Sequence, residues 1–409
     1  MDTRRAAELA ARNSYGRLVA YLAAQTRDVA AAEDAIGDAF LAALHTWPDQ
    51  GVPTKPEAWL LVTARRKLID MARRSQTQER VLNTLKTSDL GSSPPLDGES
   101  ATFPDDRLKL LFICAHPAID GAMHTPLMLQ TVLGLNAAQI ASAFLVSPTT
   151  MGQRLVRAKA KIRDAGIAFE IPAAQDLPVR SQAVLQAIYA VYTLGWDGVT
   201  GSDFRPKGLT EEAIWLARLC VDLMPAEPEA KGLLALILFC EARSQARRTA
   251  AGAYVPLSEQ NPELWSKAML REAEQVLGQA ALAQRLGRFQ LEAAIQSAHM
   301  QHGRGHPPDW DAIALLYEGL LHMAPTLGAR VSQAAAIAAA QGFTVGLQAL
   351  EKIPPEAAKN YQPYWALKAH LLQNLNQAAA AKAAYQRAIG LSEDAAIRDF
   401  LLMRSRQLP

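Results

Sequence analysis

The chain has 409 residues and a formal net charge of +2, and half of its residues are hydrophobic while few are aromatic. This length allows two or three domains with hydrophobic cores, and the alanine-rich composition favours an all-α fold. Cys114, Cys220 and Cys240 are scattered without a CxxC pair, which favours a reduced, cytoplasmic compartment over secretion. No signal-peptide pattern and no run of about 18 apolar residues occurs, so we expect no contact with a membrane.

A first helical domain is predicted over residues 10–76. Its helices are expected to break near Asp28 and within "WPDQGVPTKPE", because proline and glycine interrupt a continuous helix there. The last helix of this domain carries one acidic residue, Asp70, among a cluster of basic residues: Arg65, Arg66, Lys67, Arg73 and Arg74. Since the whole chain is nearly neutral, this local concentration of positive charge indicates an anionic partner.

A flexible linker is predicted over residues 77–104, which include the serine-, glycine- and proline-rich stretch "TSDLGSSPPLDGESATFP". The second domain, residues 105–167, ends in two short helices. Asn136 and Gln139 have the spacing of a capping box at the start of the first helix, which is expected to run to about Phe144. Ser147 and Pro148 are typical of the cap and first position of the second. Two helices joined by so short a turn predict a helix-turn-helix.

The second helix of this motif has two distinct faces. Four apolar residues are spaced to face the companion helix: Met151, Leu155, Ala158 and Ile162. The outward face then holds Thr149, Gln153, Arg154, Arg157 and Lys161. Short polar groups near the helix N-terminus can reach base edges in a major groove while the basic residues behind them meet phosphates. A solvent-exposed basic helix without a DNA role is the alternative interpretation of the same pattern.

A helical repeat domain is predicted over residues 179–409. In a 34-residue frame set at Gln362, the small and large packing positions of a tetratricopeptide-like repeat are occupied by Trp365, Ala369, Leu372, Ala381, Tyr385 and Ala388. A second frame of the same length fits the earlier helices, and an insertion around "SQARRTAAGAYVPLSEQNP" separates the two frames. Each such repeat buries its apolar face only against a neighbour. A coincidental alanine-rich bundle is the alternative.

No catalytic constellation is recognised in the sequence. His299, His302 and His306 have a spacing that could place two imidazoles on one helical face. The surrounding glycines and prolines instead predict exposed residues at a helix end, so we expect no bound metal. A phosphate-binding glycine loop, a nucleophile elbow and an HExxH motif are all absent from the sequence. We therefore expect a protein without cofactor and without enzymatic activity.

The two basic helices have a joint explanation in a family resemblance. The stretches "AAEDAIGDAFLAALHTWP" and "EAWLLVTARRKLIDMARR" resemble regions 2.2 to 2.4 of bacterial RNA polymerase sigma factors of the extracytoplasmic-function (ECF) type. The stretch "SPTTMGQRLVRAKAKIR" is similar to their region 4. The phrase "LKLLFICAHPAID", together with the C-terminal repeats, resembles the subgroup in which a tetratricopeptide-like domain is fused to the sigma core. The resemblance covers essentially the whole chain.

The resemblance implies roles for individual positions. Asp34, Asp38, Phe40 and Leu41 match the helix that docks on the largest subunit of core RNA polymerase, although Phe40 is also expected to belong to the domain core. Trp59, Arg65, Lys67, Asp70, Arg73 and Arg74 match the helix that faces the −10 element, with Trp59 expected to anchor the core. Ser147, Thr150, Gln153, Arg154 and Arg157 match the reader of the −35 element. Departures are Arg66 in place of a common asparagine, Gly37 in place of a usual glutamine, and Gly152 inside the reader helix.

The sequence thus predicts an alternative sigma factor with core RNA polymerase and promoter DNA as partners. Its C-terminal domain is expected to regulate activity by contacting either the sigma domains or another regulatory protein. A helix-turn-helix transcription regulator whose repeats bind a ligand or peptide is the principal alternative, and a repeat scaffold with incidental basic helices is a third. Neither alternative requires a polymerase-docking helix or a strand-opening helix.

Overall fold

A computed structural model describes residues 3–74, 105–144, 146–173, 175–196, 209–301 and 307–408. These residues form helices and no strands apart from a single bridge between Arg248 and Tyr254, so the all-α prediction is confirmed. The chain divides into two compact units, Met1–Gly195 with Pro206–Glu212, and Trp196–Arg205 with Ala213–Pro409. None of the described helices is both long and apolar enough to cross a membrane. The predicted linker, residues 77–104, lies outside the described residues.

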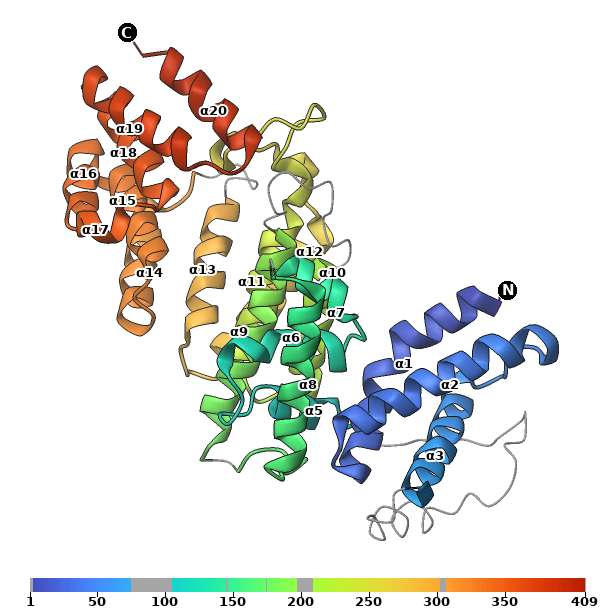
Figure 1. Cartoon of the computed structure of the whole chain (residues 1–409). Helices are drawn as coiled ribbons and strands as arrows, with labels where there is room; N and C mark the ends of the chain where they lie inside the picture. Colours follow the sequence, from blue (N-terminus) through green and yellow to red (C-terminus); the bar gives the residue numbers. More distant parts are fainter. Residues whose placement is uncertain are drawn as a thin grey trace. The chain divides into compact units, whose positions relative to one another are not determined.

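The first unit begins with three helices that pack on one another, namely α1 (Thr3–Thr26), α2 (Val29–Gln50) and α3 (Pro56–Arg74) (Figure 1). The break expected near Asp28 is confirmed, since Asp28 caps α2 and accepts a hydrogen bond from the Ala31 backbone N–H at 3.1 Å. Pro48 lies inside α2, which ends only at Gly51, where φ is +84°. Fully buried side chains of this core include Leu18, Leu22, Ile36, Trp47 and Leu60.

The same unit continues through α5 (Arg107–Cys114), α6 (Gly121–Thr131), α7 (Ala137–Ala143), α8 (Pro148–Asp164) and α9 (Leu177–Trp196). The predicted caps are present. The Asn136 and Gln139 side chains each accept a hydrogen bond from the other's backbone N–H at 2.9 Å, and Ser147 Oγ accepts one from the Thr150 backbone N–H at 3.1 Å. Helices α7 and α8 pack together, with a short turn between them. Two packed helices with a short connection are what the helix-turn-helix prediction requires.

These two parts of the first unit also pack on each other, with α1 against α5 and α6, and α2 against α8. Two glycines mark the closest approach. A Cβ added to Gly16 of α1 would lie 2.2 Å from the backbone oxygen of Val132, and one added to Gly134 would lie 3.0 Å from the Tyr15 ring. Gly134 also has a φ of +72°, which favours glycine. Any larger residue at position 16 would force these segments apart.

The second unit holds most of α10 (Leu209–Leu223) and then α11 (Pro228–Ala242), α12 (Lys267–Ala281), α13 (Arg288–Met300), α14 (Trp310–Met323), α15 (Leu327–Gln341), α16 (Phe343–Glu351), α17 (Pro355–Ala358), α18 (Gln362–Asn374), α19 (Ala378–Leu391) and α20 (Ala395–Arg406). Helices that follow one another pack as neighbours, as in α14–α15 and α18–α19 (Figure 1). In the α18–α19 pair the buried residues include Ala369, Leu372, Ala381, Tyr385 and Ala388, all predicted packing positions.

The insertion predicted between the two repeat frames contains three short 3₁₀ turns: Ser244–Ala246, Leu257–Glu259 and Pro262–Leu264. It is tied to the C-terminal helix. Arg248 pairs with Asp394, and the Arg404 guanidinium donates to Glu259 Oε1 at 2.6 Å. The insertion is therefore an ordered part of the second unit.

Candidate polymerase and nucleic-acid interfaces

Helix α2 presents one exposed face, which we call the α2 stripe and define as Asp34, Asp38, Leu41 and Leu44. Leu41 is 58% exposed and Leu44 46% exposed, although both are apolar. The opposite face of the helix is buried in the three-helix core. Phe40, expected in that core, is only half-buried and borders the stripe. Apolar side chains next to carboxylates on one helix face can enter a partner's groove while the charges fix the register.

Helix α3 divides its basic cluster between core and surface. The Arg65 side chain is buried, donates to the Tyr21 hydroxyl at 2.6 Å and lies 5.2 Å from the centre of the Tyr21 ring. Arg66 and Lys67 are exposed, as is Asp70. Lys67 also pairs with Asp38 of the α2 stripe at 3.6 Å. Arg65 thus joins α1 to α3, and only its neighbours present charge to solvent.

The remaining positions on α3 are placed less uniformly. Arg73 and Arg74 belong to the last turn of the helix, and their side chains lie outside the described residues. Trp59 is half-buried, with its ring edge-on to Trp47 at a centroid distance of 5.5 Å. This contact fits the expectation that Trp59 anchors the core.

Helix α8 shows the two faces expected from its sequence. Met151, Leu155, Ala158 and Ile162 are buried. Thr150 is half-buried, and the remaining predicted DNA-facing positions are exposed: Ser147, Thr149, Gln153, Arg154, Arg157 and Lys161. Arg157 Nε donates to the backbone oxygen of Gln153 at 3.3 Å, which directs that guanidinium along the helix. The exposed face has three cations and no carboxylate among these residues.

Two further basic residues of α8 point elsewhere, which the sequence did not predict. Lys159 Nζ lies 2.5 Å from Glu33 Oε2 on α2, and their side chains are only 12% and 8% exposed. Arg163 Nη1 of α8 lies 3.7 Å from Oδ2 of Asp28, the residue that caps α2. One feature of the sequence could have indicated this contact: Glu33 lies on the buried face of α2 with Val29, Ala32 and Ile36. A carboxylate in an apolar stripe requires a buried partner.

Burial dominates the electrostatics of this contact. It raises the pKa of Glu33 above the usual 4.5, and Asp34 and Asp28 add to the increase while Lys159 opposes it. Burial, with the nearby Glu33 and Asp34 charges, also raises the pKa of the Tyr15 hydroxyl. The site is therefore an enclosed ion pair within a negatively charged neighbourhood.

The histidines lie in the second unit. His299 lies in the last turn of α13, half-buried, with its ring 5.4 Å from that of Trp310. His299 thus lies at a helix end, as predicted, but the expectation of an exposed loop residue was wrong, because it belongs to the last turn of α13 and its ring contacts that of Trp310. Burial, aided by Arg243, lowers its pKa to about 4. His302 and His306 lie outside the described residues, among which no metal-binding cluster of three ligands occurs.

Comparison with known proteins places these helices in context. Residues 11–78 match sigma-70 region 2, and residues 180–281 match a family of unknown function (DUF6596). An uncharacterized protein of Rhizobium meliloti (strain 1021) is 37% identical over 383 residues, covering 92% of this chain and 90% of that protein. The chain belongs to the same family. No solved structure matches it.

The N-terminal domain is thus a sigma-70 region 2. This match supports the interpretation of the chain as an RNA polymerase sigma factor. Helices α2 and α3 both fall within the matched residues. A sigma region 2 implies binding to core RNA polymerase and to promoter DNA, and the sigma-70 family consists of non-enzymatic initiation factors. The α2 stripe and the exposed cations of α3 are the candidate surfaces for these two partners.

Proposed function

We propose that the chain is an alternative sigma factor of the ECF type that directs core RNA polymerase to a restricted set of promoters. The observation that carries the proposal is the presence of two adjoining exposed surfaces of opposite character on the matched region 2 domain, which meet where Lys67 pairs with Asp38 at 3.6 Å. The α2 stripe is acidic and apolar, whereas Arg66 and Lys67 on α3 are basic. A protein that holds polymerase and DNA at once needs two such surfaces of opposite character.

In this proposal the α2 stripe docks on core polymerase. Asp34 and Asp38 supply charges at the rim, and Leu41 supplies apolar area, with Phe40 behind it. Gly37 lies on the same exposed face. A Cβ added to it would have no neighbouring atom within 4 Å. The absence of a side chain there leaves room for a partner's surface.

Promoter opening is assigned to α3 and recognition of the −35 element to α8. Arg66 and Lys67 face the −10 DNA, with Arg73 and Arg74 further along the helix, while Arg65 supports the helix from within the core. On α8 the capping Ser147 and the polar Thr149, Thr150 and Gln153 occupy the N-terminal part, where base edges are reached. Arg154, Arg157 and Lys161 follow along the exposed face and contact bases or phosphates.

The second unit is proposed to be a tetratricopeptide-like domain that regulates the sigma core. Its support is the α18–α19 pair, which buries the small and large residues predicted for such a repeat. A repeat array builds its core between neighbours and leaves side faces available for a partner. Its partner is either the sigma domains of this chain or a separate regulatory protein.

The test is transcription by purified core polymerase with the full chain, using fragmented genomic DNA of the source organism as template. We expect transcripts from a small promoter set that depend on the chain. Arg66→Ala/Lys67→Ala should still bind core polymerase but fail to open these promoters, as read by permanganate footprinting, because the DNA backbone loses its cationic surface. Lys55→Ala, which removes an exposed lysine just before α3, is the matched control.

The competing function gives a different pattern. A helix-turn-helix regulator would bind duplex DNA without core polymerase and would add no initiation activity to it. Absence of chain-dependent transcripts, together with specific duplex binding by the chain alone, would therefore overturn the sigma-factor proposal.

A further inference from the structure

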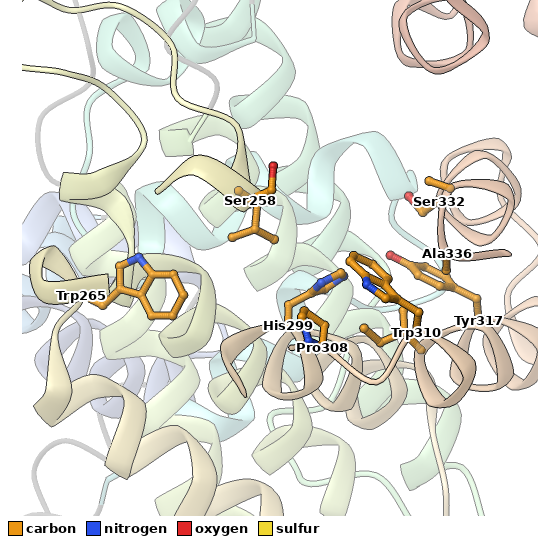
Figure 2. A pocket seen from close by; sticks show the side chains of 11 residues that line it. Ser258, Trp265, His299, Pro308, Trp310, Tyr317, Ser332 and Ala336 are labelled. Atoms are coloured by element: carbon orange, nitrogen blue, oxygen red, sulfur yellow. The ribbon is translucent and has the colours of Figure 1, made fainter. Parts of the chain in front are cut away.

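A cavity of about 500 Å3 opens inside the second unit. Its walls come from the 257–265 segment, the end of α13, the start of α14 and the middle of α15 (Figure 2). Figure 2 shows Trp265 on one side and His299, Trp310 and Tyr317 grouped on the other. The volume is within the range of small-molecule sites, roughly 300–1,000 Å3.

The shape of the cavity follows from a pairing of large and small residues. Aromatic rings form the walls on α14 and in the insertion, whereas α15 contributes only Ser332, Ala335 and Ala336. Small side chains on α15 leave unfilled the space that the facing rings would otherwise occupy. Rings that border an empty space lose dispersion contacts on that side, so a flat apolar occupant would restore them.

The charges around the cavity disfavour a cationic occupant. Burial and the Arg243 charge keep the His299 imidazole neutral near pH 7, since its pKa is lowered to about 4. The Glu292 carboxylate acts on Tyr317, and Arg288 pairs with it at 2.7 Å. The Asp309 carboxylate, between two lining residues in the sequence, caps α14. None of the lining residues is acidic. The polar groups in the wall are hydroxyls and an imidazole, and Tyr317 is hydrogen-bonded to Ser332.

We propose that this cavity binds a planar aromatic small molecule that is neutral or carries one carboxylate. Trp310 and Trp265 supply apolar ring surface for the aromatic part, and the Tyr317 hydroxyl and the His299 imidazole supply hydrogen bonds to an oxygen at its edge. The site lies partly outside the residues that match the family of unknown function, because α13, α14 and α15 follow position 281. A ligand bound in this cavity would act directly on the second unit, for which a regulatory role is proposed above.

An aromatic cage for a quaternary ammonium is the nearest competing interpretation, because tryptophan and tyrosine faces also attract cations. Such cages gain from a nearby unpaired negative charge, whereas the Glu292 carboxylate near Tyr317 is paired with Arg288, and Arg243 adds a positive charge near His299. The two interpretations therefore predict opposite orders of affinity for ligands of matched size and opposite charge.

The experiment is calorimetric titration of the full chain with 2-naphthoate, 2-naphthol and phenyltrimethylammonium. We expect single-site binding of the first two compounds and none of the third. Ala335→Phe places a ring inside the cavity and should weaken binding by about tenfold or more. Ala339→Phe, one turn further on the exposed face of α15, is the matched control and should bind like the wild type.

Trp310→Leu is a second variant that removes a wall without filling the space, and it too should weaken binding of both naphthalenes. Circular dichroism verifies that each variant keeps its helical content. Failure of both naphthalenes to bind, binding that Ala335→Phe and Trp310→Leu leave unchanged, or preferential binding of the cation would each overturn the proposal. Because no polymerase takes part, this result is independent of the sigma-factor proposal.

Discussion

Replacing Lys159 by methionine should destabilise the contact between α2 and α8 more than any change on the exposed face of α8. Methionine keeps most of the length and packing of the lysine stem but removes its charge. Glu33 would then be buried beside Asp28 and Asp34 without its cation. Its other oxygen, Oε1, is also buried and has no hydrogen-bond partner among the described residues. Removing one partner of a buried ion pair costs about 3–5 kcal/mol.

The pKa of Glu33 sets both the size of the effect and its pH dependence. Without Lys159 the carboxyl escapes by taking up a proton, and holding a group of ordinary pKa 4.5 neutral at pH 7 costs about 3.4 kcal/mol. At pH 5 the same step costs only about 0.7 kcal/mol. A folded pKa raised above the unfolded value gives stability at low pH that is lost as the pH rises through the folded pKa. The variant should therefore approach wild-type stability toward pH 5 and lose it toward pH 8.

Hydrogen exchange of the full chain, followed by mass spectrometry of peptides from α2 and α8, measures this locally. A loss of about 3 kcal/mol raises the exchange rate of protected amides by roughly a hundredfold after correction for intrinsic rates. Lys161→Met, an exposed lysine on the same helix, should change little. Adding Glu33→Gln to Lys159→Met should restore protection to within about 1 kcal/mol, because no unpaired charge remains. Equal exchange in Lys159→Met and Lys161→Met, or an effect independent of pH, would refute this reasoning.

Three further expectations follow from the same unit. Gly16→Ala should destabilise the first unit by about 1–3 kcal/mol, because the new Cβ would lie 2.2 Å from a backbone oxygen. Gly37→Ala, whose new Cβ has no neighbour within 4 Å, should stabilise α2 by about 0.5–1 kcal/mol in the same exchange measurement. Asp38→Arg should weaken competition for core polymerase, since like charges then meet at the docking surface, while −35 DNA binding through α8 should not change. Arg154→Ala should relax base preference at one −35 position by about 1–3 kcal/mol, whereas Lys161→Ala should weaken all sequences alike in a panel of single-base variants.

Local patterns predicted the helices of the first unit well. The caps at Asn136 and Ser147 and the buried face of α8 depend on residues a few positions apart, and the structure confirms them. The break at Asp28 is likewise a local capping event. These features are governed by helix geometry and by hydrogen bonds within one turn, which the sequence displays directly.

The features that the sequence did not predict depend on contacts between distant segments. Glu33 and Lys159 are 126 positions apart, so neither residue alone indicates which cation meets which carboxylate. Arg65 and Arg66 are adjacent in the sequence, yet Arg65 is buried against Tyr21 whereas Arg66 is exposed. The His299 ring contacts that of Trp310, and a sequence rich in glycine and proline separates these two residues. Tertiary packing decides each of these positions.

The division of charge on α8 changes what can be inferred from its composition. Five basic residues lie on this helix, but Lys159 and Arg163 are engaged by α2, and Arg154, Arg157 and Lys161 remain for DNA. Each phosphate contact contributes about 0.9 to the slope of log affinity against log salt. While α2 and α8 stay paired, the helix can supply at most about 2.7 of that slope rather than about 4.5. A contribution from α8 above about 2.7 would require Lys159 and Arg163 to leave their carboxylates. The cations of α3 add their own share of the slope, so the informative measurement is the change in slope on Lys159→Met. A drop of about 0.9 would show that Lys159 contacts phosphate and that the α2–α8 contact has opened on the promoter.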